Sequence, residues 1–482
     1  MNTATTDHDA KPNFKQSVAR VLADPSVSEI FTRATDRKDT ARLAALADLD
    51  DPLGVRNLAA QIKNHTLQNL DRYLKQLVDK VRKLGGHVHF ARTGEQAKEI
   101  MVGIAREAGV KNIVKAKSMV SEEIELNDEL IGAGFDVVET DLGEFILQLA
   151  NEKPSHIVTP VAHKLKEDIA ELFKEKLGIE YTTDPPTLTA AARKYLRAKF
   201  KAADMGITGV NFAVAETGTI CIVTNEGNGR MCTSRPKVLV SLMGIEKVVP
   251  RMKDLAVLLK LLGKSATGQR MTCYTSLFNG PKQADDLDGP EEFHLVIMDR
   301  GRTDILSKLE YRYILRCIRC GACLNTCPVY KIIGGHAYQS VYPGPIGTML
   351  TPLFNSFEEY QDLPLACSLC GACYDACPVR MDIPTTLIQM RNELLKQGYV
   401  PFLYRMGFKG WRIGMLSKFL YRWGSRMARI FMKPITRKGW IRWLPSMASG
   451  WTDHRDLPAM ARKPFHRQWK KLLKEIETEE QH

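Results

Sequence analysis

The chain has 482 residues, of which 44% are hydrophobic and 26% charged, a composition typical of globular proteins rather than disordered or fibrous ones. The first residues lack the apolar core of a signal peptide, and no run of 18 apolar residues follows, so we expect a cytoplasmic protein without a membrane-spanning helix. Eight of the 11 cysteines lie between residues 317 and 377, which in a cytoplasmic protein indicates metal ligation rather than disulfides.

The elements predicted along the chain indicate a helical N-terminal extension (1–64) followed by an α/β domain (65–303). Residues 14–22 carry a helical signal, and the apolar spacing of residues 66–84 predicts a helix that ends at Gly85 and Gly86. From there strands alternate with helical segments, of which residues 121–134 are one, and such alternation is typical of a sheet with helices packed on it. The predicted strands span residues 87–91, 112–118, 135–141, 156–160, 206–216, 218–226, 237–244 and 292–299.

Two copies of one cysteine spacing, C-x2-C-x2-C-x3-C-P, follow the α/β domain. Their inner sequences repeat, CGACLNTCPV at 320–329 against CGACYDACPV at 370–379. This is the run of bacterial ferredoxins, in which three cysteines hold one [4Fe–4S] cluster and the fourth serves the other cluster. Structural zinc, the alternative, normally takes two CxxC pairs and fits two fourfold runs poorly.

The spacing therefore predicts two [4Fe–4S] clusters with crossed ligand sets. The first set is Cys317, Cys320, Cys323 and Cys377, and the second set is Cys367, Cys370, Cys373 and Cys327. The 39 residues between the two runs favour a helical dicluster ferredoxin domain, predicted at 304–395, over a small free ferredoxin.

The remaining motifs indicate no further cofactor. Cys221, Cys232 and Cys273 lie outside the runs and are expected to be buried as apolar side chains. Gly227-x-Gly229 lacks the third glycine of a dinucleotide fingerprint and is predicted to be a turn, and Gly263-Lys264-Ser265 lacks the first glycine and the strand of a P-loop. His87 and His89 alternate on a strand and are expected to be solvated or packed rather than metal-binding.

Three segments, in this order along the chain, resemble the lactate-utilisation iron–sulfur proteins of the B-subunit type. They are residues 139–164, residues 209–250 and the two cysteine runs, and the resemblance extends over about residues 65–470. It implies that the α/β domain is a lactate-utilisation domain similar to CoA-transferase and sugar-isomerase folds. It also implies an electron carrier in the oxidation of L-lactate to pyruvate, working with a cysteine-rich A-type subunit and a C-type subunit.

Which part of such a complex binds the substrate stays open. The sequence has no flavin or nicotinamide fingerprint, so the chain is not expected to be catalytic alone. Alternatives are a relay subunit for another 2-hydroxy acid or a disulfide-type substrate, or an enzyme whose α/β domain itself binds the substrate. For the last case Glu216 is the catalytic candidate, with the Asn225–Arg230 turn and Arg230 available for an anion; two ordinary turns are the structural alternative.

The C-terminal region (396–482) is basic and rich in aromatic residues. Residues 391–474 hold 20 Lys and Arg against 3 Asp and Glu, a balance of +17, whereas the remaining 48 basic and 52 acidic residues balance at −4. All six tryptophans lie here: Trp411, Trp423, Trp440, Trp443, Trp451 and Trp469. Such a region suits an acidic protein partner, the anionic inner face of a membrane, or a helical extension with a solvated face. No nucleic-acid motif accompanies the charge, so nucleic acid is not expected as a partner.

Overall fold

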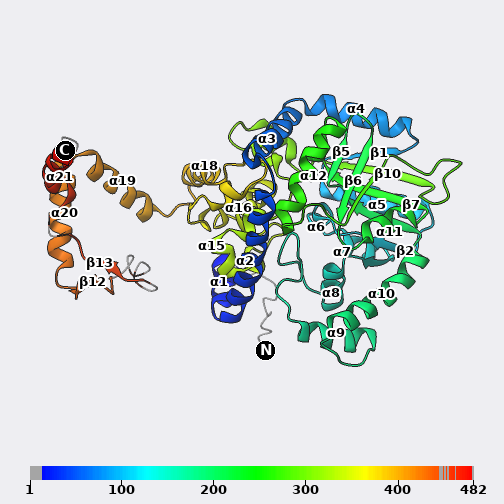
Figure 1. The fold of residues 1–482 in the computed structure, drawn as a ribbon, viewed down its shortest axis with the longest axis horizontal. Coiled ribbons are helices and arrows are strands. Elements are labelled where there is room, and N and C mark those ends of the chain that lie inside the picture. Colours follow the sequence, from blue (N-terminus) through cyan, green and yellow to red (C-terminus); the bar gives the residue numbers. More distant parts are fainter. Residues whose placement is uncertain (1–12, 445–448, 450–451, 453–454, 462, 480–482) are drawn as a thin grey trace, which may run out of the picture. The chain divides into compact units, whose positions relative to one another are not determined.

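The computed structural model describes residues 13–444, 449, 452, 455–461 and 463–479. The chain forms two compact units, one up to Gln397 and the other from Gly398, and each is described by itself. The first unit combines a helical N-terminal arm, an α/β part and a cysteine-rich helical part (Figure 1). The domain limits expected from the sequence stay predictions. Among the described residues, no helix has the length and apolar character needed to cross a membrane.

The α/β part is built on a six-stranded sheet in which every neighbouring pair is parallel, in the order β1-β10-β7-β4-β2-β3. Its strands are β1 (His87–Ala91), β2 (Asn112–Lys115), β3 (Asp136–Glu139), β4 (Met205–Gly209), β7 (Val238–Gly244) and β10 (Glu292–Met298). From β2 to β3 the sheet grows in one direction, and from β4 through β7 to β10 it grows in the other. The strand order therefore reverses between β2 and β4.

Helices cover both faces of this sheet, because alternate residues of its strands point to opposite sides. Leu295 and Ile297 of β10 join the core beneath α4 (Leu70–Lys83), whereas Val296 and Met298 join the core beneath α5 (Gly94–Glu107). The other helices of the α/β part are α6 (Met119–Glu122), α7 (Leu126–Gly132), α8 (Leu142–Ala150), α9 (Lys166–Leu177), α10 (Pro185–Ala202), α11 (Asn228–Ser234), α12 (Met252–Thr267) and α13 (Arg302–Ser307).

A second, mixed sheet lies beside the first in the order β8-β5-β6-β9. It consists of β5 (Phe212–Val214), β6 (Thr219–Thr224), β8 (Val248–Val249) and β9 (Tyr274–Phe278), with the short helix η1 (Ile245–Lys247) before β8. Phe212 of β5 and Leu258 of α12 belong to the same buried cluster as Tyr330 and Met390 of the cysteine-rich part. The two parts thus share one hydrophobic core.

The cysteine-rich part consists of short helices joined by loops, as the sequence predicts. They are η2 (Arg312–Arg316), α14 (Ala322–Asn325), α15 (Pro328–Ile333), η3 (His336–Tyr338), α16 (Gly344–Phe354), η4 (Leu363–Leu365), α17 (Ala372–Ala376) and α18 (Ile383–Lys396). Helices α14 and α17, each of which contains the third cysteine of its run, pack against each other. The two runs therefore lie together in space.

The N-terminal arm ties the α/β part to the cysteine-rich part. It comprises α1 (Phe14–Leu22), α2 (Pro25–Ala47) and α3 (Pro52–Gln68), drawn in blue in Figure 1. Both α2 and α3 begin with an aspartate cap followed by proline, a combination that fixes the first turn. Helix α2 then packs against α12 on one side and against α14 and α15 on the other.

Several elements differ from the sequence prediction. The strand predicted at 156–160 is wrong: this segment is a loop, because the His156 ring nitrogen Nδ1 accepts the backbone N–H groups of Val158 and Thr159 that a sheet would need. The helix predicted at 66–84 is interrupted at Asn69. The helix predicted at 121–134 is interrupted at Glu125, whose φ of 49° is left-handed.

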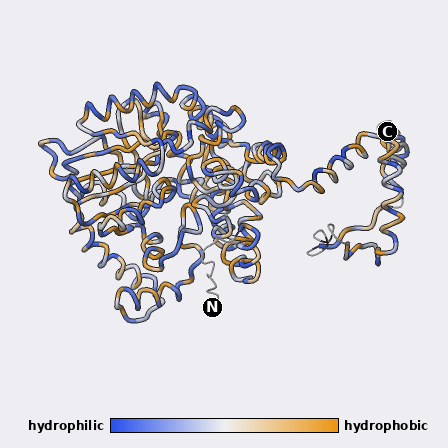
Figure 2. Tube along the Cα trace, turned by 180° about the vertical axis from the view of Figure 1, so that it is seen from behind, coloured by the Kyte–Doolittle hydropathy of each residue, from blue (hydrophilic) through white to orange (hydrophobic). Residues whose placement is uncertain are grey.

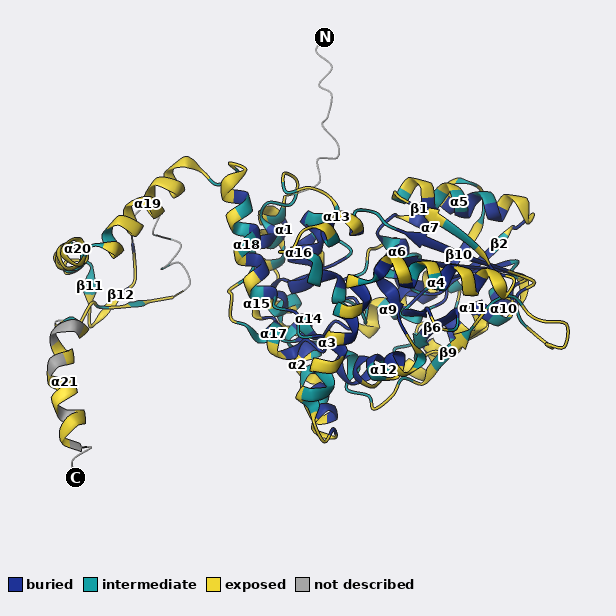
Figure 3. Ribbon diagram, turned by 90° about the horizontal axis from the view of Figure 1, so that it is seen from above, coloured by how far each residue is buried: buried dark blue, intermediate teal, exposed yellow. Residues whose placement is uncertain are grey.

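The second unit is open and helical. It contains α19 (Phe402–Leu416), α20 (Lys418–Met432), the two-residue strands β11 (Thr436–Arg437), β12 (Trp440–Ile441) and β13 (Leu457–Pro458), and α21 (Phe465–Glu479). Neither α19 nor α20 contains a buried residue, and Figure 3 colours most of their residues as exposed and the others as intermediate. Hydrophobic and hydrophilic residues mix along them (Figure 2), so large apolar side chains face solvent: Trp411 is 60% and Phe419 is 74% exposed. Trp451 lies outside the described residues.

Candidate iron–sulfur centres and substrate site

The two cysteine runs adopt the same local backbone. Arg319 and Leu369, two residues after the first cysteine of each run, have left-handed φ angles of 60° and 56°. Gly321 and Gly371 follow with φ of 75° and 84°, where a side chain would be strained. In this conformation the backbone N–H of Arg319 donates to Cys317 Sγ at 3.4 Å, and that of Leu369 donates to Cys367 Sγ at 3.3 Å. Such bonds stabilise a thiolate, the form of cysteine that binds iron.

The pKa values of several cysteines are raised by burial, and cysteines of the other run contribute to these shifts. Burial raises the pKa of the Cys377 thiol to about 11, and Cys317 of the other run adds to the shift. Burial likewise raises the pKa of Cys327 to about 11, with Cys367 and Cys370 adding to it. Cys373 is raised to about 12 by burial, and its neighbours Cys367, Cys327 and Cys370 all contribute.

The pKa values of Cys320 and Cys323 in the first run are raised as well, and both Cys373 and Cys377 of the second run contribute to the shift of Cys323. Burial raises the pKa of Cys320, with Cys377 and Cys317 contributing, and it raises the pKa of Cys323 well above the ordinary thiol value. Thiols that are buried together in this way cannot all ionise unless a strong positive charge compensates them, and iron supplies that charge. These five thiols therefore suit iron–sulfur ligation chemically, and the less buried Cys317, Cys367 and Cys370 complete the two runs.

Two arginines hold the loops that carry the cysteines. From α3, the Arg56 guanidinium donates to the carbonyl oxygen of Cys377 at 2.9 Å and to that of Asp375 at 2.5 Å. From α18, Arg391 donates to the carbonyls of Cys367 at 2.8 Å and Pro364 at 2.9 Å. Neither arginine was found from the sequence, since Arg56 lies 321 residues from Cys377 and belongs to no motif.

A buried ionic network links the α/β part to the first cysteine loop. Arg302 donates to both carboxylate oxygens of Glu123, at 2.7 and 2.9 Å, and to Glu246 Oε2 at 2.7 Å. The other oxygen of Glu246 lies 3.5 Å from Arg319 Nη2, and the Tyr342 hydroxyl donates to Glu123. Burial alone would raise the pKa of Glu246, but Arg302 and Arg319 outweigh it and lower that pKa to about 2.

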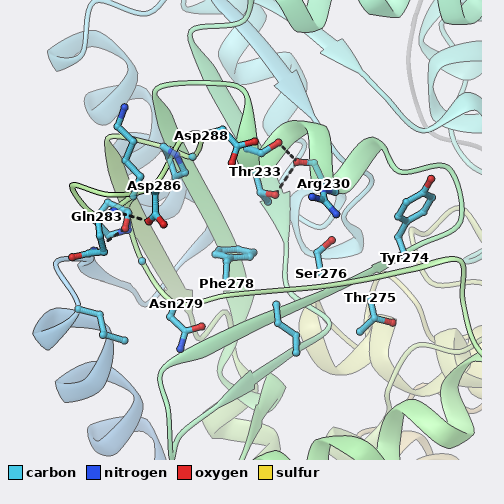
Figure 4. A pocket seen from close by; sticks show the side chains of 18 of the residues that line it. Arg230, Thr233, Tyr274, Thr275, Ser276, Phe278, Asn279, Gln283, Asp286 and Asp288 are labelled. Atoms are coloured by element: carbon cyan, nitrogen blue, oxygen red, sulfur yellow. Dashed lines mark hydrogen bonds between the residues drawn. The ribbon is translucent and has the colours of Figure 1, made fainter.

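Glu216 and Arg230, which the sequence suggested as parts of one substrate site, have different surroundings in the structure. Glu216 is exposed, and its carboxylate caps α12 by accepting the Met252 backbone N–H at 3.0 Å. Arg230 lines a broad open groove of about 850 Å³ formed by β9 and the following loop, together with Asp286 and Asp288 (Figure 4). Among the described residues that line this groove, Glu216 is not included. The catalytic role of Glu216 stays a prediction.

Cys221 and Cys232 are fully buried, as expected, and burial raises the pKa of each to about 12. The expectation for Cys273 is wrong. This residue is exposed and lines the open groove, because it lies in the loop between α12 and the edge strand β9, where its backbone N–H donates to Asn225 Oδ1 at 3.1 Å.

The glycine motifs and the histidines make contacts that belong to the fold: a helix contact, a turn and stacked rings. Lys264 lies inside α12 and donates to the Ala45 carbonyl at 3.0 Å, which is incompatible with a P-loop. Gly227 forms the predicted turn, although α11 follows it before Pro236. His87 and His89 stack on His294 of the neighbouring strand β10, with ring centroids 4.9 and 5.3 Å apart.

Comparisons with known proteins match most of the chain. Residues 74–298 match the LUD domain, residues 313–381 the 4Fe-4S dicluster domain, and residues 392–474 the domain described as lactate utilisation protein B, C-terminal. Proteins named lactate utilization protein B from Bacillus cytotoxicus and Bacillus cereus strain B4264 are each 45% identical over 463 residues, which cover 96% of this chain and 97% of theirs.

Among solved structures, a DUF162 family protein from Deinococcus radiodurans aligns with 48% of this chain and 98% of its own, at 13% identity and a TM-score of 0.26. The identity to the Bacillus proteins extends over the α/β part, both cysteine runs and the basic region. The chain therefore belongs to the lactate utilization protein B family, and it is an iron–sulfur protein with a 4Fe–4S dicluster domain.

Proposed function

We propose that this protein is the electron-transfer subunit of a complex that oxidises L-lactate to pyruvate, working with a cysteine-rich A-type subunit and a C-type subunit. Its membership of the lactate utilization protein B family supports the substrate. A [4Fe–4S] cluster, when bound, takes up and releases one electron at a time, so a pair of clusters suits a reaction that yields two electrons.

The chain's own residues would hold the clusters in crossed sets. Cys317, Cys320, Cys323 and Cys377 form one set, and Cys367, Cys370, Cys373 and Cys327 form the other. The observation that carries this proposal is the proximity between the runs: α14 of the first run packs against α17 of the second. In line with it, Cys377 contributes to the raised pKa of Cys320, and Cys327 to that of Cys373. Arg56 and Arg391 position the fourth and first cysteines of the second run through their carbonyl groups.

The basic C-terminal region is proposed as the docking surface for the partner subunits. Its exposed aromatic side chains on α19 and α20 lie among arginines and lysines, and residues 400–452 contain no acidic residue. Exposed apolar patches of this kind mark interaction sites, and the positive charge favours an acidic partner surface. The alternative is that this region contacts an anionic lipid surface. A vesicle-binding assay distinguishes lipid binding from binding to a protein partner.

The experiment that tests the function compares the chain alone with the chain plus both partner subunits. Anaerobically purified protein should contain about eight iron and eight labile sulfide per chain. L-Lactate should reduce the clusters, followed by electron paramagnetic resonance, only when the partners are present. If the isolated chain oxidised lactate, it would be an enzyme in its own right and the relay proposal would fail. If only another 2-hydroxy acid or a disulfide supported reduction, the substrate would be reassigned.

A further inference from the structure

A cavity of about 210 Å³ lies where the strand order of the large sheet reverses. Lys117, Asp141 and Asn211, which come directly after β2, β3 and β4, line it on one side. Arg319 and Cys320 of the first cysteine run line it as well. In open α/β sheets the crevice at such a reversal is where ligands bind. The volume is below the range of about 300–1,000 Å³ for drug-sized ligands and suits a small metabolite.

The charges around this cavity favour an anion. Lys117, Lys247 and Arg319 are positively charged, against the acids Asp141 and Glu226. Both acids already accept hydrogen bonds from the backbone: Asp141 from Gly143 and Glu144 at 3.0 and 3.2 Å, and Glu226 from Asn225 at 3.2 Å. The three positive groups thus outnumber the two acids, and the backbone already engages one carboxylate oxygen of each acid.

Buried polar atoms without a partner also line the cavity. Within the described part of the chain, Lys117 Nζ, Thr224 Oγ1, Asn228 Oδ1 and two guanidinium nitrogens of Arg319, Nε and Nη1, are buried and make no hydrogen bond. Asn228 is only 6% exposed, and its Nδ2 already donates to Thr140 Oγ1 at 3.3 Å. Unsatisfied buried polar atoms are costly and uncommon, so their gathering on one cavity indicates a polar ligand there.

Lys117 is short of a counterion on the protein side. The nearest carboxylate oxygen, Glu144 Oε1, lies 3.7 Å from its Nζ, beyond hydrogen-bond distance. Burial raises the pKa of Glu144, although Lys117 lowers it, so burial disfavours the charged form of this carboxyl group. The ammonium group is thus available to a ligand carboxylate.

We infer that this cavity binds a small 2-hydroxy monocarboxylate, so that this chain itself, and not only its partners, holds the substrate. Lys117 and Arg319 bind the carboxylate, Asn228 Oδ1 accepts a hydrogen bond from the ligand's hydroxyl group, and the Thr224 hydroxyl donates one to the ligand. A molecule in this place lies beside Cys320. The inference rests on the proposed function for the choice of L-lactate as the probe, and it assigns no bond-making step to these residues.

The test is isothermal titration calorimetry of the full-length, anaerobically purified iron–sulfur protein with L-lactate, pyruvate and inorganic phosphate. L-Lactate should bind in the absence of partner subunits, and more tightly than pyruvate, which has no hydroxyl to donate. Lys117→Met should weaken L-lactate binding at least about tenfold, because it removes a charged hydrogen bond. Iron content measured on each variant shows that the clusters remain.

A matched pair of threonine variants separates a ligand contact from a structural one. Thr224→Val should weaken L-lactate binding without lowering the melting temperature, since its hydroxyl has no protein partner. Thr66→Val, remote from the cavity, should do the reverse, because the Thr66 hydroxyl is buried and donates to the Ile62 carbonyl at 2.8 Å.

The inference is overturned if the parent protein does not bind L-lactate. It is also overturned if Lys117→Met and Thr224→Val bind L-lactate as tightly as the parent protein does. Phosphate binding as tightly as L-lactate also overturns it, by showing a general anion site. Binding is measured without electron transfer, so its failure is distinct from failure of the relay. If the isolated chain binds L-lactate but L-lactate does not reduce the clusters in the presence of the partners, only the relay proposal fails. If the clusters are reduced but the isolated chain binds no L-lactate, only the present inference fails.

Discussion

Replacing Arg302 by methionine tests whether the buried ionic network holds the α/β part against the cysteine-rich part. Arg302 is fully buried and neutralises two carboxylates that are also buried, Glu123 and Glu246. Removing one partner of a buried pair costs about 3–5 kcal/mol, because a charge is stranded away from water. Two carboxylates are stranded here, but Arg319 still faces Glu246 and Tyr342 still faces Glu123. We therefore expect a loss of about 4 kcal/mol in the free energy of unfolding.

Urea denaturation of the full-length iron–sulfur protein, followed by circular dichroism under anaerobic conditions, measures this loss. Arg270→Met is the matched control, since both partners of the Arg270–Asp48 pair are exposed and keep much of their water. Adding Glu123→Gln and Glu246→Gln to Arg302→Met should recover part of the stability by removing the stranded charges. If Arg302→Met were as stable as the control, or if the two glutamine substitutions restored no stability, the network would not stabilise the protein by pairing charges.

Three further predictions follow from the described contacts. Cys377→Ser should perturb the cluster of the first run and Cys327→Ser that of the second; spectra in which each run keeps its own fourth ligand would refute the crossing. Truncation after residue 400 should preserve iron and sulfide content but weaken association with partner subunits or anionic vesicles, and raised salt should mimic it; unchanged association at low salt would mean a packed extension. Because the folded pKa of Glu246 is lowered from 4.5 to about 2, its stabilisation is present above pH 4.5 and is lost as the pH falls towards 2. Melting temperatures should therefore fall less steeply over that window in Glu246→Gln, and parallel curves would contradict the assignment.

Local features were predicted well because their causes are local. The helix Phe14–Leu22 and the strand His87–Ala91 have the limits that their apolar spacing and flanking glycines indicate. In the cysteine runs, the left-handed backbone of Gly321 and Gly371 is likewise what the sequence indicates, whereas the ligand sets stay a prediction. The left-handed backbone at Arg319 and Leu369 was not predictable, because neither residue type favours it.

Features that depend on distant residues escaped the sequence. A side chain, His156, decides that residues 156–160 form a loop rather than a strand, and its ring also lies 3.3 Å from Asn325 in the cysteine-rich part. Glu216 looked like an isolated acid at a turn, whereas the helix it caps begins 36 residues later. The residues of the small cavity come from many separate segments, and only the strand order, which no sequence pattern states, brings them together.

The contact between α3 and the second cysteine run has a consequence for how the protein is made. Arg56 leaves the ribosome early, and Cys377 is synthesised 321 residues later. A cluster that needs Cys377 as well as Cys317 cannot be completed on a partial chain, whatever iron is supplied during translation. With crossed ligation, assembly would wait until nearly the whole first unit has emerged, and until then the earlier thiols would remain open to oxidation. Iron-delivery factors would consequently act on the finished chain rather than on the nascent one.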